Sequence, residues 1–215
     1  MNEKLQESAQ YLRCCSAIEI EAFKLYQTLA KKFNQPESSF ILGLAYDSLK
    51  ATKLIQGIMD YFDLPELQPI TCKKNLSELA NEVSLLSNKI SKINNLSYEL
   101  SVEILKECIN LEDLLSEDYT NYLQSTAPKM ITDEFSKVFT VNLSNFKKVL
   151  EALIEEKGQH RQIIIEIIYW FEAKQAENLR QITPIVKYQN PDSWIHESTL
   201  HAFSSTPAQA TSSES

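Results

Sequence analysis

Glycine is scarce in this sequence, with 3 residues among 215, and proline contributes only 7. Because these two residue types most often end helices and form turns, their scarcity favours long helices over many short strands. No run approaches the roughly 20 apolar residues that a membrane span needs. The first residues, MNEKLQESAQ, also lack an apolar signal core. We therefore expect a helical, cytoplasmic protein without a membrane partner.

Basic residues are also in deficit. The chain has 21 Lys and Arg against 29 Asp and Glu, which gives a formal net charge of −8 and a sequence pI near 5.0. Nucleic acids and anionic membrane surfaces bind proteins through basic faces, so we expect neither as a partner. The 43% hydrophobic content suffices for one globular core.

Metal-binding and redox motifs built on cysteine are missing. Cys14 and Cys15 are adjacent, whereas Cys72 and Cys108 stand alone, so no CxxC pair exists. We expect all four to be reduced thiols, most of them buried. The 3 histidines are His160, His196 and His201, and their positions give no support for a Ser-His-Asp arrangement.

Apolar residues recur at intervals of three and four in five segments, which is the period of one helix face. The segments are residues 3–33, 40–61, 74–94, 105–122 and 133–175. The short connection at 34–37 makes the first two helices antiparallel neighbours. The stripe of the third segment contains no charge, which indicates a structural helix.

Periodicity ends after residue 182, and the last residues are rich in Ser, Thr, Ala and Pro. This composition is typical of disorder. We therefore expect one helical domain at 1–182 and an irregular, partly disordered tail at 183–215.

Four of the five segments carry one carboxylate inside the apolar stripe. These residues are Glu19, Asp47, Glu112 and Glu156. Asp47 stands in the middle of the stripe Phe40, Leu44, Asp47, Ala51, Leu54, Ile58 and Tyr61. Buried carboxylates that approach one another repel unless a cation neutralises them. Together with the imidazole of His160, such a set suits iron, manganese or zinc.

These residues resemble the ferritin-like and rubrerythrin-like four-helix bundles. Glu19, Ala22 and Tyr26 look like the first-helix motif of the rubrerythrin branch, and Glu112 matches the third-helix carboxylate. Residues 47–51 and 156–160 stand where the family has its two Glu-x-x-His pairs. The resemblance implies an antiparallel four-helix bundle with a di-metal site, here with an additional helix at 74–94 between the second and third bundle helices.

The sequence departs from this pattern at both histidines. Lys50 and Gln159 occupy the expected positions, and His160 is displaced by one residue, or about 100° around the helix. The ammonium of Lys50 could instead reach the carboxylates and supply the charge that a metal would supply. A simpler reading is an ion pair between Lys50 and Asp47, which are three residues apart.

Helix lengths test whether Glu112 and Glu156 can meet. Glu112 is about 18 Å from the end of its helix, whereas an unbroken helix from Asp133 would place Glu156 about 35 Å from the same connection. We therefore predict a break at 142–145 and a separate short helix or turn at 133–141. A stagger of roughly 7 Å between Glu19 and Asp47 leaves Glu21 as a substitute for Glu19.

Three functional hypotheses follow. The first is a diverged ferritin-like protein with a degenerate metal site and no cofactor, which acts as a structural or protein-interaction module, as a homodimer or with another protein. The second is an iron- or manganese-binding protein with oxidase, peroxidase or metal-handling activity. Its ligands would be Glu19, Asp47, Glu112, Glu156 and His160. The third is an unrelated helical adaptor whose carboxylates face water. The sequence leaves open whether the protein is an enzyme, and it identifies no partner or biological process.

Overall fold

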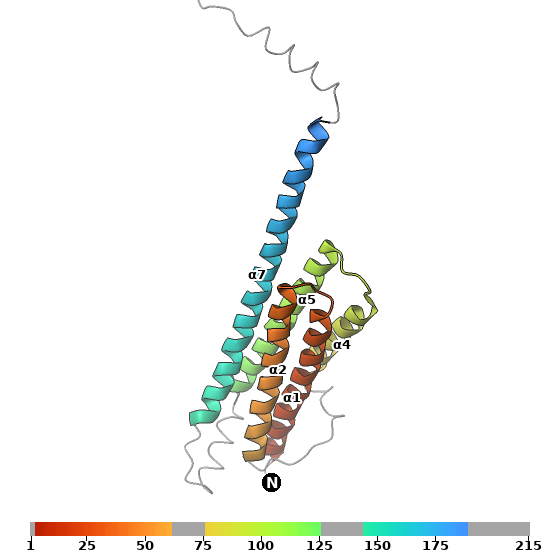
Figure 1. Cartoon of the computed structure of the whole chain (residues 1–215). Coiled ribbons are helices and arrows are strands. Elements are labelled where there is room, and N and C mark those ends of the chain that lie inside the picture. Colours follow the sequence, from red (N-terminus) through yellow and green to blue (C-terminus); the bar gives the residue numbers. More distant parts are fainter. Residues whose placement is uncertain (1–2, 62–75, 126–143, 189–215) are drawn as a thin grey trace, which may run out of the picture. The chain divides into compact units, whose positions relative to one another are not determined.

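A computed structural model describes residues 3–61, 76–125 and 144–188. Within these ranges the chain is helical and contains no strand, which confirms the all-α prediction (Figure 1). The helices are α1 (Glu3–Ala30), α2 (Glu37–Tyr61), α4 (Ser77–Lys92), α5 (Tyr98–Gln124) and α7 (Ser144–Tyr188). None of them is long and apolar enough to cross a membrane. The chain divides into two compact units, Met1–Tyr169 and Trp170–Ser215, and the helix packing below belongs to the first.

The helix bounds follow the sequence periodicity closely for α1, α2, α4 and α5. The fifth helix differs, because α7 continues to Tyr188, beyond the expected end near residue 175. It begins at Ser144, inside the range 142–145 where we predicted a break. The short helix or turn predicted at 133–141 lies outside the described residues, as does 189–215 of the predicted tail.

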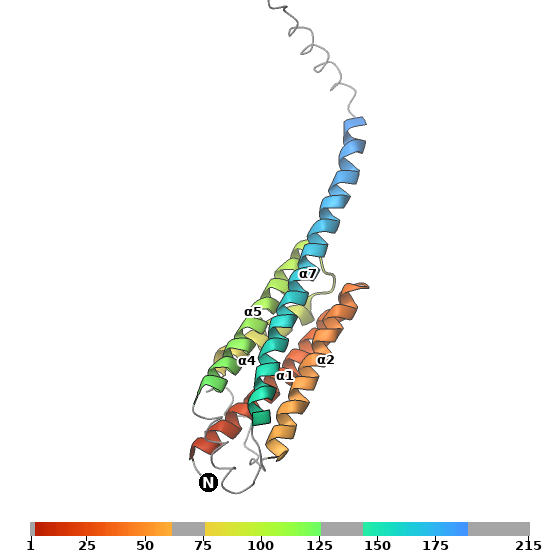
Figure 2. The ribbon, with the colours of Figure 1, turned by 90° about the vertical axis from the view of Figure 1, so that its left-hand side faces the viewer.

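Contacts between α1 and α5 show that these helices are antiparallel. The hydroxyl of Tyr11 donates to the backbone carbonyl of Asp118 at 2.6 Å, and Tyr26, further along α1, reaches Glu112, which comes earlier in α5. The rings of Tyr11 and Tyr122 stack with centroids 4.4 Å apart. α1 and α2 are joined by a short connection and lie side by side in both ribbon views (Figure 2).

The start of α7 runs antiparallel to α2. Asp47 contacts His160, whereas Lys50, later in α2, contacts Glu156, earlier in α7. Because α1 is antiparallel to both α2 and α5, these last two helices point in the same direction. The connection from α2 to α5 must therefore return along the length of the helices, and α4 lies within it.

The buried face of α2 is rotated from the predicted one. Ile41, Ser48 and Ile55 are buried, but Phe40 and Leu54, which we placed in the inward stripe, are 55% and 40% exposed. α2 is apolar on more than one side, so spacing alone did not determine its orientation. The small residues Ala45, Ser48 and Ala51 lie on the buried face and allow close approach to α1.

α4 packs against α1 and α5 through the stripe that the sequence predicted. Leu79, Val83, Leu86 and Ile90 are buried, with Ile93 half-buried at the end. Lys89 anchors the polar side of this contact, with its Nζ atom 2.7 Å from Glu103 and 2.6 Å from Glu107 on α5. The hydroxyl of Ser97 caps α5 by accepting the backbone N–H of Leu100.

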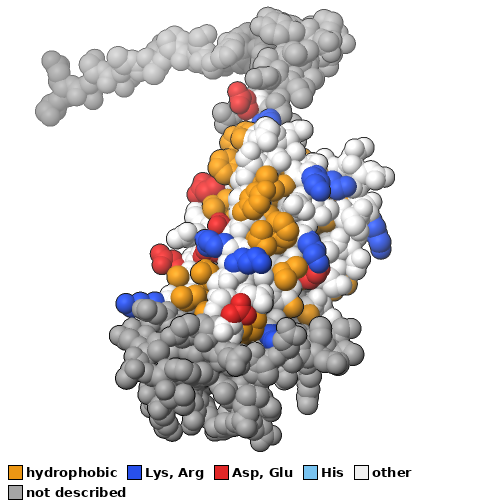
Figure 3. Space-filling model, turned by 60° about the horizontal axis from the view of Figure 1, so that its bottom comes forward, with side chains coloured by type: hydrophobic (Ala, Val, Ile, Leu, Met, Phe, Trp, Pro, Cys, Tyr) orange, Lys and Arg blue, Asp and Glu red, His pale blue; other side chains and the backbone are white. Residues whose placement is uncertain are grey.

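Hydrophobic side chains also reach the surface. Figure 3 shows several of them gathered on one face of the molecule, with Lys and Arg side chains around them. Among the described residues of the first unit, the large exposed hydrophobic ones are Phe40, Tyr46, Leu54, Leu85 and Tyr169. Exposed apolar groups that gather on one face are candidates for protein–protein contact.

Two adjacent leucines of α4 test its packing. Leu86 is 5% exposed and Leu85 is 64% exposed. Leu86→Ala should lower the free energy of unfolding by about 2–4 kcal/mol, because it removes buried methyl groups and leaves a cavity. Leu85→Ala should change it by less than about 0.5 kcal/mol. Denaturant unfolding followed by circular dichroism measures both, and equal losses would contradict the described orientation of α4.

Candidate functional site

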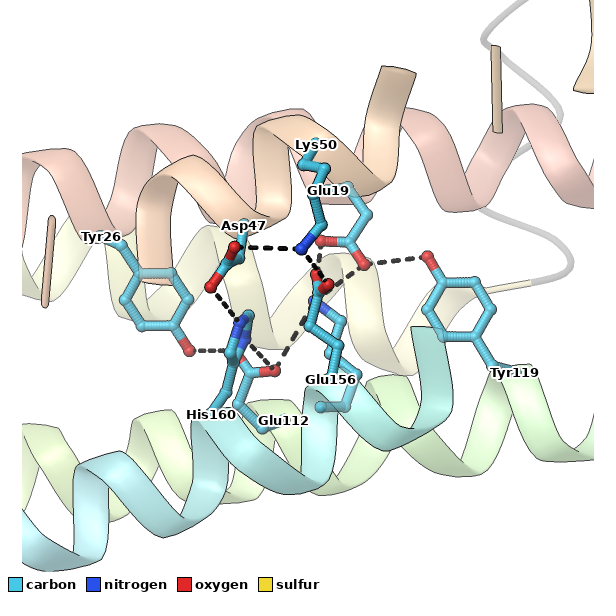
Figure 4. Close-up of polar contacts among 9 residues, drawn as sticks. Glu19, Tyr26, Asp47, Lys50, Glu112, Tyr119, Glu156 and His160 are labelled. Atoms are coloured by element: carbon cyan, nitrogen blue, oxygen red, sulfur yellow. Dashed lines mark hydrogen bonds and ion pairs between the residues drawn. The ribbon is translucent and has the colours of Figure 1, made fainter. Parts of the chain in front are cut away.

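Two carboxylates lie fully inside the first unit. Glu19 of α1 is 0% exposed and Glu112 of α5 is 1% exposed. Each accepts a hydrogen bond from a buried tyrosine: Tyr119 donates to Oε1 of Glu19 at 2.9 Å, and Tyr26 donates to Oε1 of Glu112 (Figure 4). Both phenols come from the helix opposite their acceptor, so the two pairs cross-link α1 and α5.

The ammonium of Lys157, on α7, lies beside both carboxylates. Its Nζ atom is 2.9 Å from each carboxylate oxygen of Glu19 and 3.7 Å from Oε2 of Glu112, and all three side chains have no exposed surface. A buried cation placed between two buried carboxylates neutralises their repulsion directly. We call these three residues the buried ion cluster.

The orientation of α7 explains why Lys157 was missed. The predicted stripe ran through Val149, Leu153, Glu156 and His160. In the structure the buried residues of this part of α7 are Leu150, Leu153, Lys157, His160, Ile164, Ile167 and Ile168. Their spacing is equally regular, so the signal was present in the sequence. A lysine is usually assigned to the surface, however, and nothing local to α7 indicates that two carboxylates face this one.

His160 connects the buried ion cluster to the protein surface. Its Nδ1 atom lies 3.3 Å from Oε2 of Glu112, and its Nε2 atom lies 3.3 Å from Oδ2 of Asp47. The imidazole is buried, whereas the Asp47 side chain is 41% exposed. A neutral imidazole donates from only one nitrogen, so both contacts are hydrogen bonds only when His160 is protonated.

Lys50 neutralises the outer part of the site. It pairs with Asp47 at 3.2 Å, as predicted, and also contacts Glu156 of α7. Lys50 therefore reaches two of the four predicted carboxylates, but its side chain is 53% exposed and the cation beside Glu19 and Glu112 is Lys157. Lys50 neutralises carboxylates at the edge of the site, and Lys157 neutralises those at its centre. Oε1 of Glu156 is buried and accepts no hydrogen bond from the described residues.

Charge balance fixes the protonation of the cluster. Burial by itself would raise the pKa of Glu112, but Lys157, His160 and Tyr26 outweigh it and hold this pKa below its ordinary value of 4.5. Burial would likewise lower the pKa of Lys157, but Glu112, Glu19 and Glu156 raise it above 10.5. Burial and the neighbouring carboxylate raise the pKa of Tyr26. At pH 7 Glu112 is therefore ionised, Lys157 is an ammonium and the phenol of Tyr26 is neutral.

The remaining predicted residues lie at or near the surface. Gln159 is exposed, and Glu21, the proposed substitute for Glu19, is exposed and paired with Lys24 at 2.6 Å. The exposure that the adaptor hypothesis expects is not found for Glu19 and Glu112, which are buried.

The cysteines also required a correction. Cys14 is disulfide-bonded, so the prediction that all the thiols are reduced is wrong for this residue. Cys15 and Cys108 are free and buried, as expected. Burial is the main reason that the pKa values of both thiols are raised, which makes them poor nucleophiles.

The residues at the centre do not fit a resident metal ion. The Lys157 ammonium contacts the oxygens of Glu19 that would ligate the metal, so an ion bound there would have to displace it. Across the described helices, no group of three or more His, Cys, Asp or Glu side chains is arranged to hold a metal. The lysine supplies the positive charge that the carboxylates require.

In comparisons with known proteins, no family model, curated protein or solved structure matches this chain. Its function has to be inferred from the geometry of its own residues.

Removing the central ammonium should destabilise the fold strongly. Lys157→Met leaves two buried carboxylates without a cation, which should lower the free energy of unfolding by about 3–5 kcal/mol. Lys50→Met, at the exposed edge, should lower it by at most about 1 kcal/mol. Adding Glu19→Gln to the Lys157→Met variant should recover part of the loss. Chemical denaturation measures all three, and equal effects of the two lysine variants would refute the central role of Lys157.

Acidification should reveal the same cluster. The pKa of Glu112 is lower in the folded state than its ordinary value of 4.5. The ionised carboxylate therefore stabilises the fold above pH 4.5, and this stabilisation is lost as the pH falls through the folded-state pKa. In Lys157→Met, burial should raise the pKa of the carboxylates that have lost the ammonium. This variant should therefore become more stable as acidification protonates them. The stability difference between wild type and variant should therefore shrink between pH 7 and pH 4. A constant difference over this range would contradict the assignment of charges.

Proposed function

We propose that this chain is a diverged ferritin-like four-helix bundle that works as a structural or protein-interaction module, with a lysine in place of the metal. The directions of its helices support this proposal. α1 is antiparallel to α2 and α5, and a single connection crosses from one end of the helices to the other, as in ferritin-like folds. The carboxylates of α1 and α5 lie at the same depth, because both contact Lys157.

One observation carries the functional part of the proposal. The ammonium of Lys157 is fully buried and lies 2.9 Å from both oxygens of Glu19. A ferritin-like oxidase needs carboxylate oxygens that are free to bind a metal, and here they bind a side chain of the same protein. Its cation cannot be lost, exchanged or reduced, so the centre is suited to holding helices together.

The buried ion cluster and its tyrosines then have a structural role. Lys157 ties α7 to α1 and α5, while Tyr26 and Tyr119 tie those two helices to each other. Because each polar group is satisfied in only one arrangement, the cluster favours a single alignment of the helices. A rigid bundle of this kind presents fixed outer surfaces for contact with other proteins.

A second candidate function is iron or manganese binding at the edge of the site. It is favoured by the buried, unsatisfied Oε1 atom of Glu156, which belongs to the same group of contacts as Asp47 and His160. Metal binding there would require Lys50 to move away from Glu156 and Asp47. The protein would then carry the oxidase, peroxidase or metal-handling activity that the resemblance implies.

Metal analysis distinguishes the two functions. The full chain, incubated with Fe(II) or Mn(II) under anaerobic conditions and desalted, should retain far less than one ion per chain by elemental analysis. Lys157→Ala provides the positive control, because removing the ammonium frees the oxygens of Glu19 and Glu112, and His160 lies beside Glu112. This variant should gain thermal stability with added divalent ions.

Stoichiometric metal in the wild-type protein would overturn the structural assignment. If Asp47→Asn abolished that binding, the metal would lie at the edge of the site, as the second candidate requires.

A further inference from the structure

We draw no further inference here: the strongest candidate, the groove between α1 and α4 that is lined by Thr28, Ser87, Asn88 and Ser91 over Leu25 and Ile90, carries no proposal, because the hydroxyls of Thr28 and Ser91 already donate to backbone carbonyls of their own helices and nothing in the structure shows what covers it.

Discussion

The arrangement of this protein depends on one buried ionic contact, between Lys157 and the carboxylates of Glu19 and Glu112. Two carboxylates enclosed by apolar side chains are unstable without a cation, and a lysine enclosed in the same way is unstable without an anion. Each group therefore makes the burial of the others possible. Because they come from α1, α5 and α7, their contact requires these three helices to meet at one depth.

The other features of the site follow from that requirement. Tyr26 and Tyr119 each donate one hydrogen bond to a carboxylate, and both remain neutral, since burial and the adjacent charges raise their pKa values. His160 extends the network from Glu112 to Asp47 at the surface. The charged groups at the centre of the site are thus fully buried, whereas Asp47 and Lys50, the residues that α2 contributes at its edge, are partly exposed.

Sequence periodicity was sufficient for the all-helical fold and for five residues of the site, namely Glu19, Asp47, Glu112, Glu156 and His160. Glu19 and Glu112 lie in stripes whose other members are unambiguously apolar, so their burial could be predicted. On α2 and α7 two orientations have similar apolar content, and the choice between them is made by packing against other helices. Lys157 could not be predicted from its own helix, because its burial is favourable only when carboxylates from α1 and α5 are already in place.

The protonation and shielding of Lys157 provide the most direct test of the central claim. Proton–nitrogen NMR of the lysine ammonium groups should show one signal, absent in Lys157→Met, that exchanges slowly with water and persists above pH 10.5, the ordinary lysine pKa. Slow exchange is expected because the group is fully buried and bound to carboxylates. If every ammonium group instead exchanged rapidly and titrated at its ordinary value, Lys157 would not be the internal cation of this bundle.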